Sequence, residues 1–157
     1  METNSKTQGV ENASVTLAAG MHFAGNIDGF RVDTDASESF GGTDAGPQPL
    51  RFLLLGLAGC TAMDVISILR KKRQRVSGFE VEARGSRVDE HPKVYDAIEV
   101  VYKVRGRGVD PEAVERTIEL SKSRYCPAIA MVGKAADISS RSRSKKKTDP
   151  AGRSLRY

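Results

Sequence analysis

Two cysteines are the side chains of this sequence with the clearest potential for chemistry. Cys60 lies inside a long apolar stretch, and Cys126 directly precedes Pro127. A cysteine thiolate attacks peroxides and disulfides, whereas a cysteine in a protein core is only a small apolar residue. Cys126 stands at the expected start of a helix, where the helix dipole favours the thiolate. Cys60 has no comparable feature in its own helix, so the sequence leaves both interpretations open for each cysteine.

Other reactive groups are only weakly indicated. His22 and His91 could join the two cysteines in a metal site on paper, but none of the spacings resembles a zinc motif. The paired glycines Gly41-Gly42 lack the strand, loop and helix that a phosphate-binding loop needs. We therefore expect no metal and no cofactor.

A long helix over residues 48–75 is predicted to carry Cys60. Its apolar residues recur at helical spacing, and Pro49 fits the first turn, where its missing N–H costs nothing. Basic residues crowd its far end, where cations oppose the negative pole of the helix dipole. Because this helix is apolar on nearly all sides, we expect it to be central and covered by other elements.

The same helix raises the question of a membrane span. Its uncharged part is near the lower length limit for a span, and Asp64 is the only charged residue between Phe52 and Leu69. A charge in the middle of a span is costly, and glycine and hydroxyl residues dilute the apolarity. We expect a buried helix of a soluble protein and no membrane.

The remaining elements predict an α+β fold, with antiparallel sheets wrapped around long central helices. Alternating or turn-bounded segments predict strands at residues 13–19, 20–34 (with a turn at 26–29), 79–84 and 97–104, the last two as antiparallel neighbours. Asp110 and Pro111 are a helix cap and first residue, and this second helix is expected to run to Tyr125. Pro127 then starts a short apolar helix with Cys126 at its N-cap.

The positive charge is concentrated at the C-terminal end. The net charge is +5, but residues 139–157 hold seven Lys or Arg and one acid, so the rest of the chain is nearly neutral. We expect residues 1–12 to be flexible, residues 13–138 to form the domain, and residues 139–157 to be a disordered basic tail. No basic groove with interleaved aromatics is apparent, so nucleic-acid binding is not expected. The lack of an apolar N-terminal signal and the two cysteines predict a cytoplasmic protein.

Two motifs together resemble the OsmC/Ohr family of small thiol-dependent peroxidases and their relatives. The first is Leu-Ala-Gly-Cys-Thr-Ala-Met-Asp-Val around Cys60, and the second is Ser-Arg-Tyr-Cys-Pro around Cys126. The resemblance covers roughly residues 13–138. It implies an intertwined homodimer with active sites at the dimer interface. It also implies that Cys60 is the peroxidatic cysteine, oxidised to sulfenic acid, and that Cys126 is the resolving cysteine.

The sequence also departs from the family. Well-characterised members have a glutamate about ten residues before the first cysteine and an arginine from an early strand, which together tune the thiolate. Here Leu50 and Arg51 stand in that region, no glutamate occurs between Glu38 and Cys60, and Arg31 is the only arginine near the early strands. Arg51 is too far along its own helix to contact Cys60 directly. The chain therefore resembles an OsmC-like branch without the usual Arg/Glu pair.

These observations predict thiol-dependent reduction of hydrogen peroxide or organic hydroperoxides by a homodimer, with a dithiol as reductant. The apolar surroundings of Cys60 suit an alkyl or lipid peroxide. The alternative is a non-enzymatic OsmC-like redox sensor or small-ligand-binding dimer, and a third possibility is a structural domain whose cysteines are core residues. The sequence identifies neither the peroxide nor the reductant.

Overall fold

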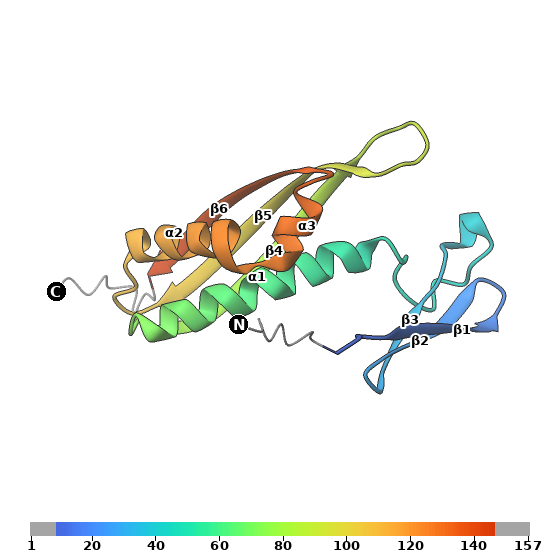
Figure 1. Cartoon of the computed structure of the whole chain (residues 1–157), viewed down its shortest axis with the longest axis horizontal. Helices are drawn as coiled ribbons and strands as arrows, with labels where there is room; N and C mark the ends of the chain where they lie inside the picture. The colour runs from blue at the N-terminus through green and yellow to red at the C-terminus, as the bar shows by residue number, and fades with distance from the viewer. Residues whose placement is uncertain (1–8, 147–157) are drawn as a thin grey trace, which may run out of the picture. The chain divides into compact units, whose positions relative to one another are not determined.

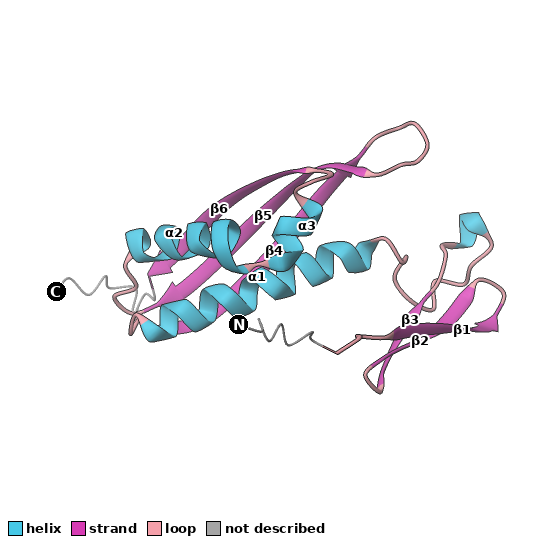
Figure 2. Ribbon diagram, viewed as in Figure 1, coloured by secondary structure: helices cyan, strands magenta, loops and turns pink. Residues whose placement is uncertain are grey.

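The computed structural model describes residues 9–146, which fold as two compact units divided between Phe52 and Leu53 (Figure 1). The α+β class is confirmed: two three-stranded sheets alternate with helices along the chain (Figure 2). Whereas the sequence predicts one domain over residues 13–138, the chain forms two units.

The first unit is an antiparallel sheet followed by an ordered loop. Its strands are β1 (Ala13–Ala19), β2 (His22–Ile27) and β3 (Phe30–Thr34), paired in sequence order. The predicted turn is present, with Asp28 and Gly29 at its tip, both with positive φ. Many apolar side chains of this unit are exposed: Val15, Leu17, Ile27, Phe30 and Phe40. The hydrophobic core of the described chain lies entirely in the second unit.

Asp35 holds the loop after β3 together. Its side chain is 1% exposed and accepts hydrogen bonds from the backbone N–H groups of Ala36, Thr43 and Ala45 and from the Thr43 hydroxyl. These donors, the Thr43 N–H first, lower the pKa of Asp35 to about 2. The loop is rich in Gly, Ser and Asp, yet it is fixed by one buried carboxylate.

The second unit packs three helices on one face of a sheet (Figure 1). The long helix α1 (Arg51–Lys71) is followed by the hairpin β4 (Val76–Arg87) and β5 (Tyr95–Gly106), antiparallel as predicted. Then come α2 (Pro111–Leu120), the π-helical turn η2 (Ser121–Tyr125) and α3 (Pro127–Val132). Asp110 caps α2 through a hydrogen bond from Glu112 N–H, as the sequence predicts. The core joins α1 and α2 to alternate residues of β5. It includes Leu57 and Val65 of α1, Val100 and Tyr102 of β5, and Val114 of α2.

A sixth strand, β6 (Asp137–Lys146), overturns the prediction that the tail is disordered from residue 139. It pairs in parallel with β5, so the second sheet is mixed rather than antiparallel. Ile138 packs against the core, and Arg141 binds the Glu99 carboxylate with two hydrogen bonds of 2.6 and 3.1 Å. An edge strand needs a partner on one side only, and its outer face can be polar. Residues 147–157 of the predicted tail, and residues 1–8 of the predicted flexible N-terminus, lie outside the described residues.

Helix α1 is covered on one side only. Leu57, Val65 and Leu69 are buried in the core, whereas Leu55 is 66% exposed and Met63 70% exposed. Within residues 9–146, α1 is the one helix long and apolar enough to cross a membrane, a test that core helices of soluble proteins also pass. The sequence predicts a central helix covered by other elements, and within this chain only one face of α1 is covered.

Candidate functional site

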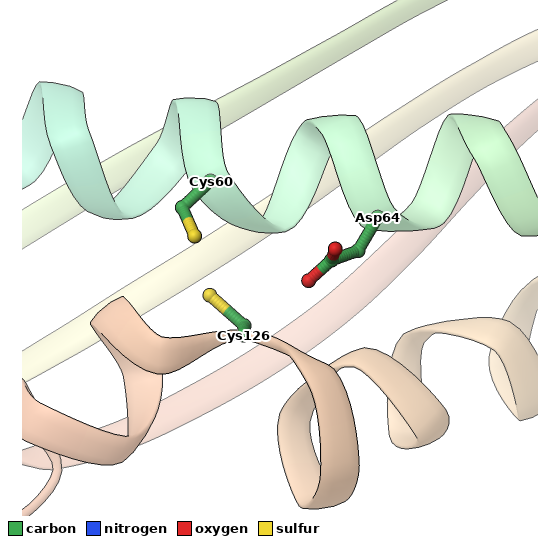
Figure 3. Close-up of side chains that lie close together, drawn as sticks. All are labelled: Cys60, Asp64 and Cys126. Carbon is green, nitrogen blue, oxygen red and sulfur yellow. The ribbon is translucent and has the colours of Figure 1, made fainter. Parts of the chain in front are cut away.

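The two cysteines meet between α1 and the start of α3. Cys60 lies in the middle of α1 and is half-buried, and Cys126 is 3% exposed at the N-cap of α3. Their sulfur atoms and a carboxylate oxygen of Asp64 all lie within 4.8 Å of one another. Figure 3 shows the two sulfurs turned toward each other, with the Asp64 carboxylate beside them. The two cysteines therefore lie side by side, as the roles implied by the family resemblance require.

Local sequence explains how each cysteine reaches this point. Cys60 and Asp64 are four residues apart on α1, so their side chains share one face of the helix. Pro127 begins α3, which leaves Cys126 extended just before it, at φ −77° and ψ 104°. In this conformation Cys126 Sγ accepts a hydrogen bond of 3.4 Å from Ile129 N–H.

Burial outweighs the helix terminus at Cys126. The sequence predicts that the N-cap position favours a thiolate, and the Ile129 N–H does lower the pKa. Desolvation is the larger effect, and together with the neighbouring Cys60 it raises the pKa of Cys126 to about 11. Cys126 is therefore a neutral thiol at physiological pH, and the expectation from its helix position alone is wrong.

A chain of buried hydroxyl groups leads to Asp64. Thr61 Oγ1 lies 2.7 Å from the Tyr102 hydroxyl and 2.9 Å from Ser121 Oγ, and Ser121 donates to Asp64 Oδ2 at 3.2 Å. Each hydroxyl has one proton to donate. Because Ser121 donates to Asp64, Thr61 must donate to Ser121, and Tyr102 to Thr61. The chain therefore has one direction and ends on the carboxylate beside the sulfurs.

A groove of about 310 Å³ opens next to this cluster. Asp64, Ser67, Ile68 and Lys71 of α1 form one side, and Leu120 and Tyr125 of the following helices form the other. Its walls are largely apolar, and Asp64 and Lys71 are the charged residues that line it. Asp64 is thus shared between the groove and the cysteine pair.

The family is decided by sequence comparison. The family profile described as "OsmC-like protein" matches residues 41–141, which include both cysteines. The chain belongs to the OsmC family. Organic hydroperoxide resistance proteins are among the solved structures that share this fold, at 14–16% identity.

Individual relatives and solved structures are similar over most of this chain. Protein YhfA of Escherichia coli K12 is 34% identical over 127 residues, which are 80% of this chain and 92% of YhfA. The crystal structure of a hypothetical protein from Aquifex aeolicus VF5 is similar with a TM-score of 0.79 and 26% identity, over 89% of this chain and 99% of that chain. An organic hydroperoxide resistance protein from Elizabethkingia anophelis shares the fold, with a TM-score of 0.67 and 16% identity over 89% and 99% of the two chains.

Sequence reasoning missed Asp64 as a member of the OsmC-type cysteine cluster. The signal was present, because a single carboxylate in an otherwise uncharged apolar helix needs a polar partner, and its spacing puts it on the face of Cys60. Neither histidine belongs to the cluster, since the group of potential ligands found in residues 9–146 is Cys60, Asp64 and Cys126. Arg31, the only arginine near the early strands in the sequence, forms an ion pair with Asp33 within the first sheet.

Proposed function

We propose that this OsmC-family protein is a two-cysteine thiol peroxidase that reduces hydrogen peroxide or organic hydroperoxides. The observation that carries the proposal is the approach of the Cys60 and Cys126 sulfurs to within 4.8 Å. A disulfide requires about 2.05 Å between the sulfurs, so side-chain rotations and a small local shift would complete the bond. The organic hydroperoxide resistance protein that shares the fold supports the same chemistry.

The different burial of the two cysteines supports the assignment of their roles. Cys60 is half-buried, so a peroxide can reach it, whereas Cys126 is buried and held as a thiol. In the first step the Cys60 sulfur attacks the peroxide, an S–O bond forms, the O–O bond breaks, and the alcohol or water leaves after taking a proton. In the second step Cys126 attacks the sulfenic acid, an S–S bond forms and water leaves. A dithiol reductant then restores both thiols.

The groove suggests the class of peroxide. Ile68, Leu120 and Tyr125 line the groove together with Asp64, whose carboxylate lies next to the cysteine pair, and this apolar surface suits the alkyl part of an organic hydroperoxide. Between turnovers the thiols must be reduced, so the proposal puts the protein in the cytoplasm and out of the membrane. It includes no contact with nucleic acid.

The active unit of this proposal is a homodimer. The first sheet exposes apolar side chains without a core of its own, and α1 exposes Leu53, Leu55 and Met63. A three-stranded sheet needs a covered apolar face to be stable. A second copy of the chain would supply that cover.

The test compares peroxide consumption by the wild-type protein, Cys60→Ser and Cys126→Ser, with a dithiol as reductant. We expect Cys60→Ser to lose activity and Cys126→Ser to accumulate a sulfenate on Cys60 that a specific probe traps. Label on Cys126 alone would reverse the roles, and the absence of any peroxide-dependent label or disulfide would reject the proposal.

The alternative, a redox sensor without turnover, is favoured by one observation. The family's glutamate before the first cysteine is missing from this chain. Rapid disulfide formation followed by slow reduction with every dithiol tested would support the sensor rather than the peroxidase.

A further inference from the structure

We propose that the reduced protein binds one Zn²⁺ ion through Cys60, Asp64 and Cys126. This site goes beyond the peroxidase function and revises the expectation from sequence that the chain holds no metal. Two sulfurs and one carboxylate oxygen are a donor set that zinc accepts, with a fourth position left for water.

The geometry of the three donors fits a single tetrahedral ion. With Zn–S distances of about 2.3 Å and a Zn–O distance of about 2.0–2.2 Å, neighbouring donors lie about 3.5–3.8 Å apart. The three donors already lie within 4.8 Å of one another, so each would need to move by about 1 Å or less. Cys60 and Asp64 come from successive turns of one helix, and Cys126 comes from the facing helix start. Two of the three ligands are thus fixed by a single rigid element.

Hydrogen bonds outside the donor set orient two of the ligands. Ser121 donates to one oxygen of Asp64 at 3.2 Å, and this bond is the end of the hydroxyl chain from Tyr102. Ile129 N–H donates to Cys126 Sγ at 3.4 Å, an arrangement that also stabilises a thiolate. Such outer contacts are typical of metal sites and contribute strongly to their affinity.

The groove provides a path for the ion. It connects Asp64, one of the three donors, with the surface between α1 and the end of α2. Lys71 also lines this groove, and its positive charge has the sign that favours a site whose three anionic ligands exceed the charge of Zn²⁺ by one.

Metal binding and disulfide formation exclude each other, because both use the same two sulfurs. Hydrogen peroxide would take two electrons from the bound thiolates and, with two protons, become two molecules of water. The sulfurs would join as a disulfide and the ion would leave. This consequence rests on the proposed peroxidase function, whereas binding to the reduced protein does not.

The test is a Co²⁺ titration of the reduced, metal-free protein without oxygen, followed by displacement with Zn²⁺. We expect one Co²⁺ per chain with a thiolate-to-cobalt charge-transfer band that Zn²⁺ removes. Cys60→Ser and Cys126→Ser should each weaken binding at least about 100-fold, since loss of even an outer contact costs 10–100-fold. Asp64→Asn should weaken it at least about 10-fold, and Asp89→Asn, in the exposed β4–β5 hairpin, should leave it unchanged.

The outcome does not depend on peroxidase activity, which is measured separately on metal-free protein. Absence of the charge-transfer band in the wild type, or equal binding by wild type and Cys60→Ser, would overturn the site. Should Cys126→Ser fail to fold, Cys60→Ser and Asp64→Asn decide alone, because both positions are only half-buried. Protein with the Cys60–Cys126 disulfide must not bind Co²⁺, and binding by that form would equally reject the proposal.

Discussion

Thr61 is the central residue of the polar network behind the cysteine pair. Its side chain is fully buried in α1, accepts from the Tyr102 hydroxyl of β5 and donates to Ser121 of η2. Three elements thus meet at one hydroxyl group. Because a buried donor without a partner costs more than a hydrogen bond contributes, the network constrains these elements to one arrangement.

We predict that Thr61→Val lowers the free energy of unfolding by about 1–3 kcal/mol. Valine has nearly the same shape, so the loss comes from the Tyr102 donor and the Ser121 acceptor left without partners. Urea unfolding measures this change in the free energy of unfolding. Tyr102→Phe should cost less, because it removes the donor together with its need for a partner.

The double variant Thr61→Val/Tyr102→Phe is the control for that interpretation. Both changes remove the same hydrogen bond. The double variant should therefore lose less stability than the two single variants lose in sum. Full additivity would show that the two hydroxyls do not interact.

Asp35 gives a second prediction at the residue scale, in the acid range. Its pKa is lowered to about 2 by the donors of the loop, whereas in the unfolded chain the pKa lies near its ordinary value of 3.8. The ionised form is therefore favoured by folding, and its contribution is present above about pH 4 and lost as the pH falls through 2. Asp35→Asn should lower stability at pH 7 and remove this part of the acid dependence.

The measurement is the urea midpoint of wild type and Asp35→Asn between pH 2 and 7, with the exposed Asp89→Asn as the matched control. The difference between wild type and Asp35→Asn should shrink below pH 4. A constant difference across the whole range would contradict the assigned cause.

At the scale of elements, β6 closes the second unit. It follows β5 through α2 and α3, which is the crossover that parallel strands require. Its polar Ser/Arg alternation suits the outer edge of the sheet, and Ile138 supplies a contact with the core. The same segment also brings the chain back past α3, the helix that positions Cys126.

We predict that a chain ending after residue 136 is less stable than a chain ending after residue 146. The shorter chain loses the strand pairing with β5 and the partial burial of Ile138, which is worth less than the roughly 1.5–3 kcal/mol of a fully buried side chain. Thermal unfolding of the two truncated forms measures the difference. Equal melting temperatures would show that β6 contributes nothing to the second unit.

The elements that the sequence predicts well carry local signals. Asp110 and Pro111 start α2, Pro127 starts α3, and the apolar alternation of β5 marks a strand with one buried face. By contrast, β6 has a polar sequence, and this strand is stabilised by pairing with β5, which is distant in sequence. The cysteine pair followed from family motifs, but the third member, Asp64, and the direction of the hydroxyl chain depend on how α1, β5 and η2 pack. Local patterns do not contain that information.

The pKa of Cys126 is a second property that local sequence patterns predict only in part. Its N-cap place was readable from Pro127, and the hydrogen bond from Ile129 confirms it. Its burial was not readable, because it depends on the packing of α1 against α3. Burial decides the pKa of Cys126, so sequence analysis predicts the effect of the helix end and misses the larger effect of burial.

At the scale of the whole molecule, the exposed apolar surface is the feature that needs an explanation. Val15, Leu17 and Phe30 of the first sheet and Leu55 and Met63 of α1 are each between 58% and 75% exposed. Single exposed apolar residues are ordinary, but several on one helix and one sheet indicate an interface. This supports the homodimer of the proposed function.

We predict that the wild-type protein is a dimer at micromolar concentration and that Leu55→Glu dissociates it. In a single chain this position is 66% exposed, so glutamate there should change monomer stability by only about 0.5 kcal/mol. In a dimer that covers α1 the carboxylate would be buried without a partner, at a cost of about 3–5 kcal/mol. The dissociation constant should then rise by at least about 100-fold. Sedimentation equilibrium measures both proteins, and Val10→Glu, at a fully exposed position before β1, is the matched control. A stable folded wild-type monomer would rule out the dimer, whereas a dimer unaffected by Leu55→Glu would mean that the interface lies elsewhere than on this face of α1.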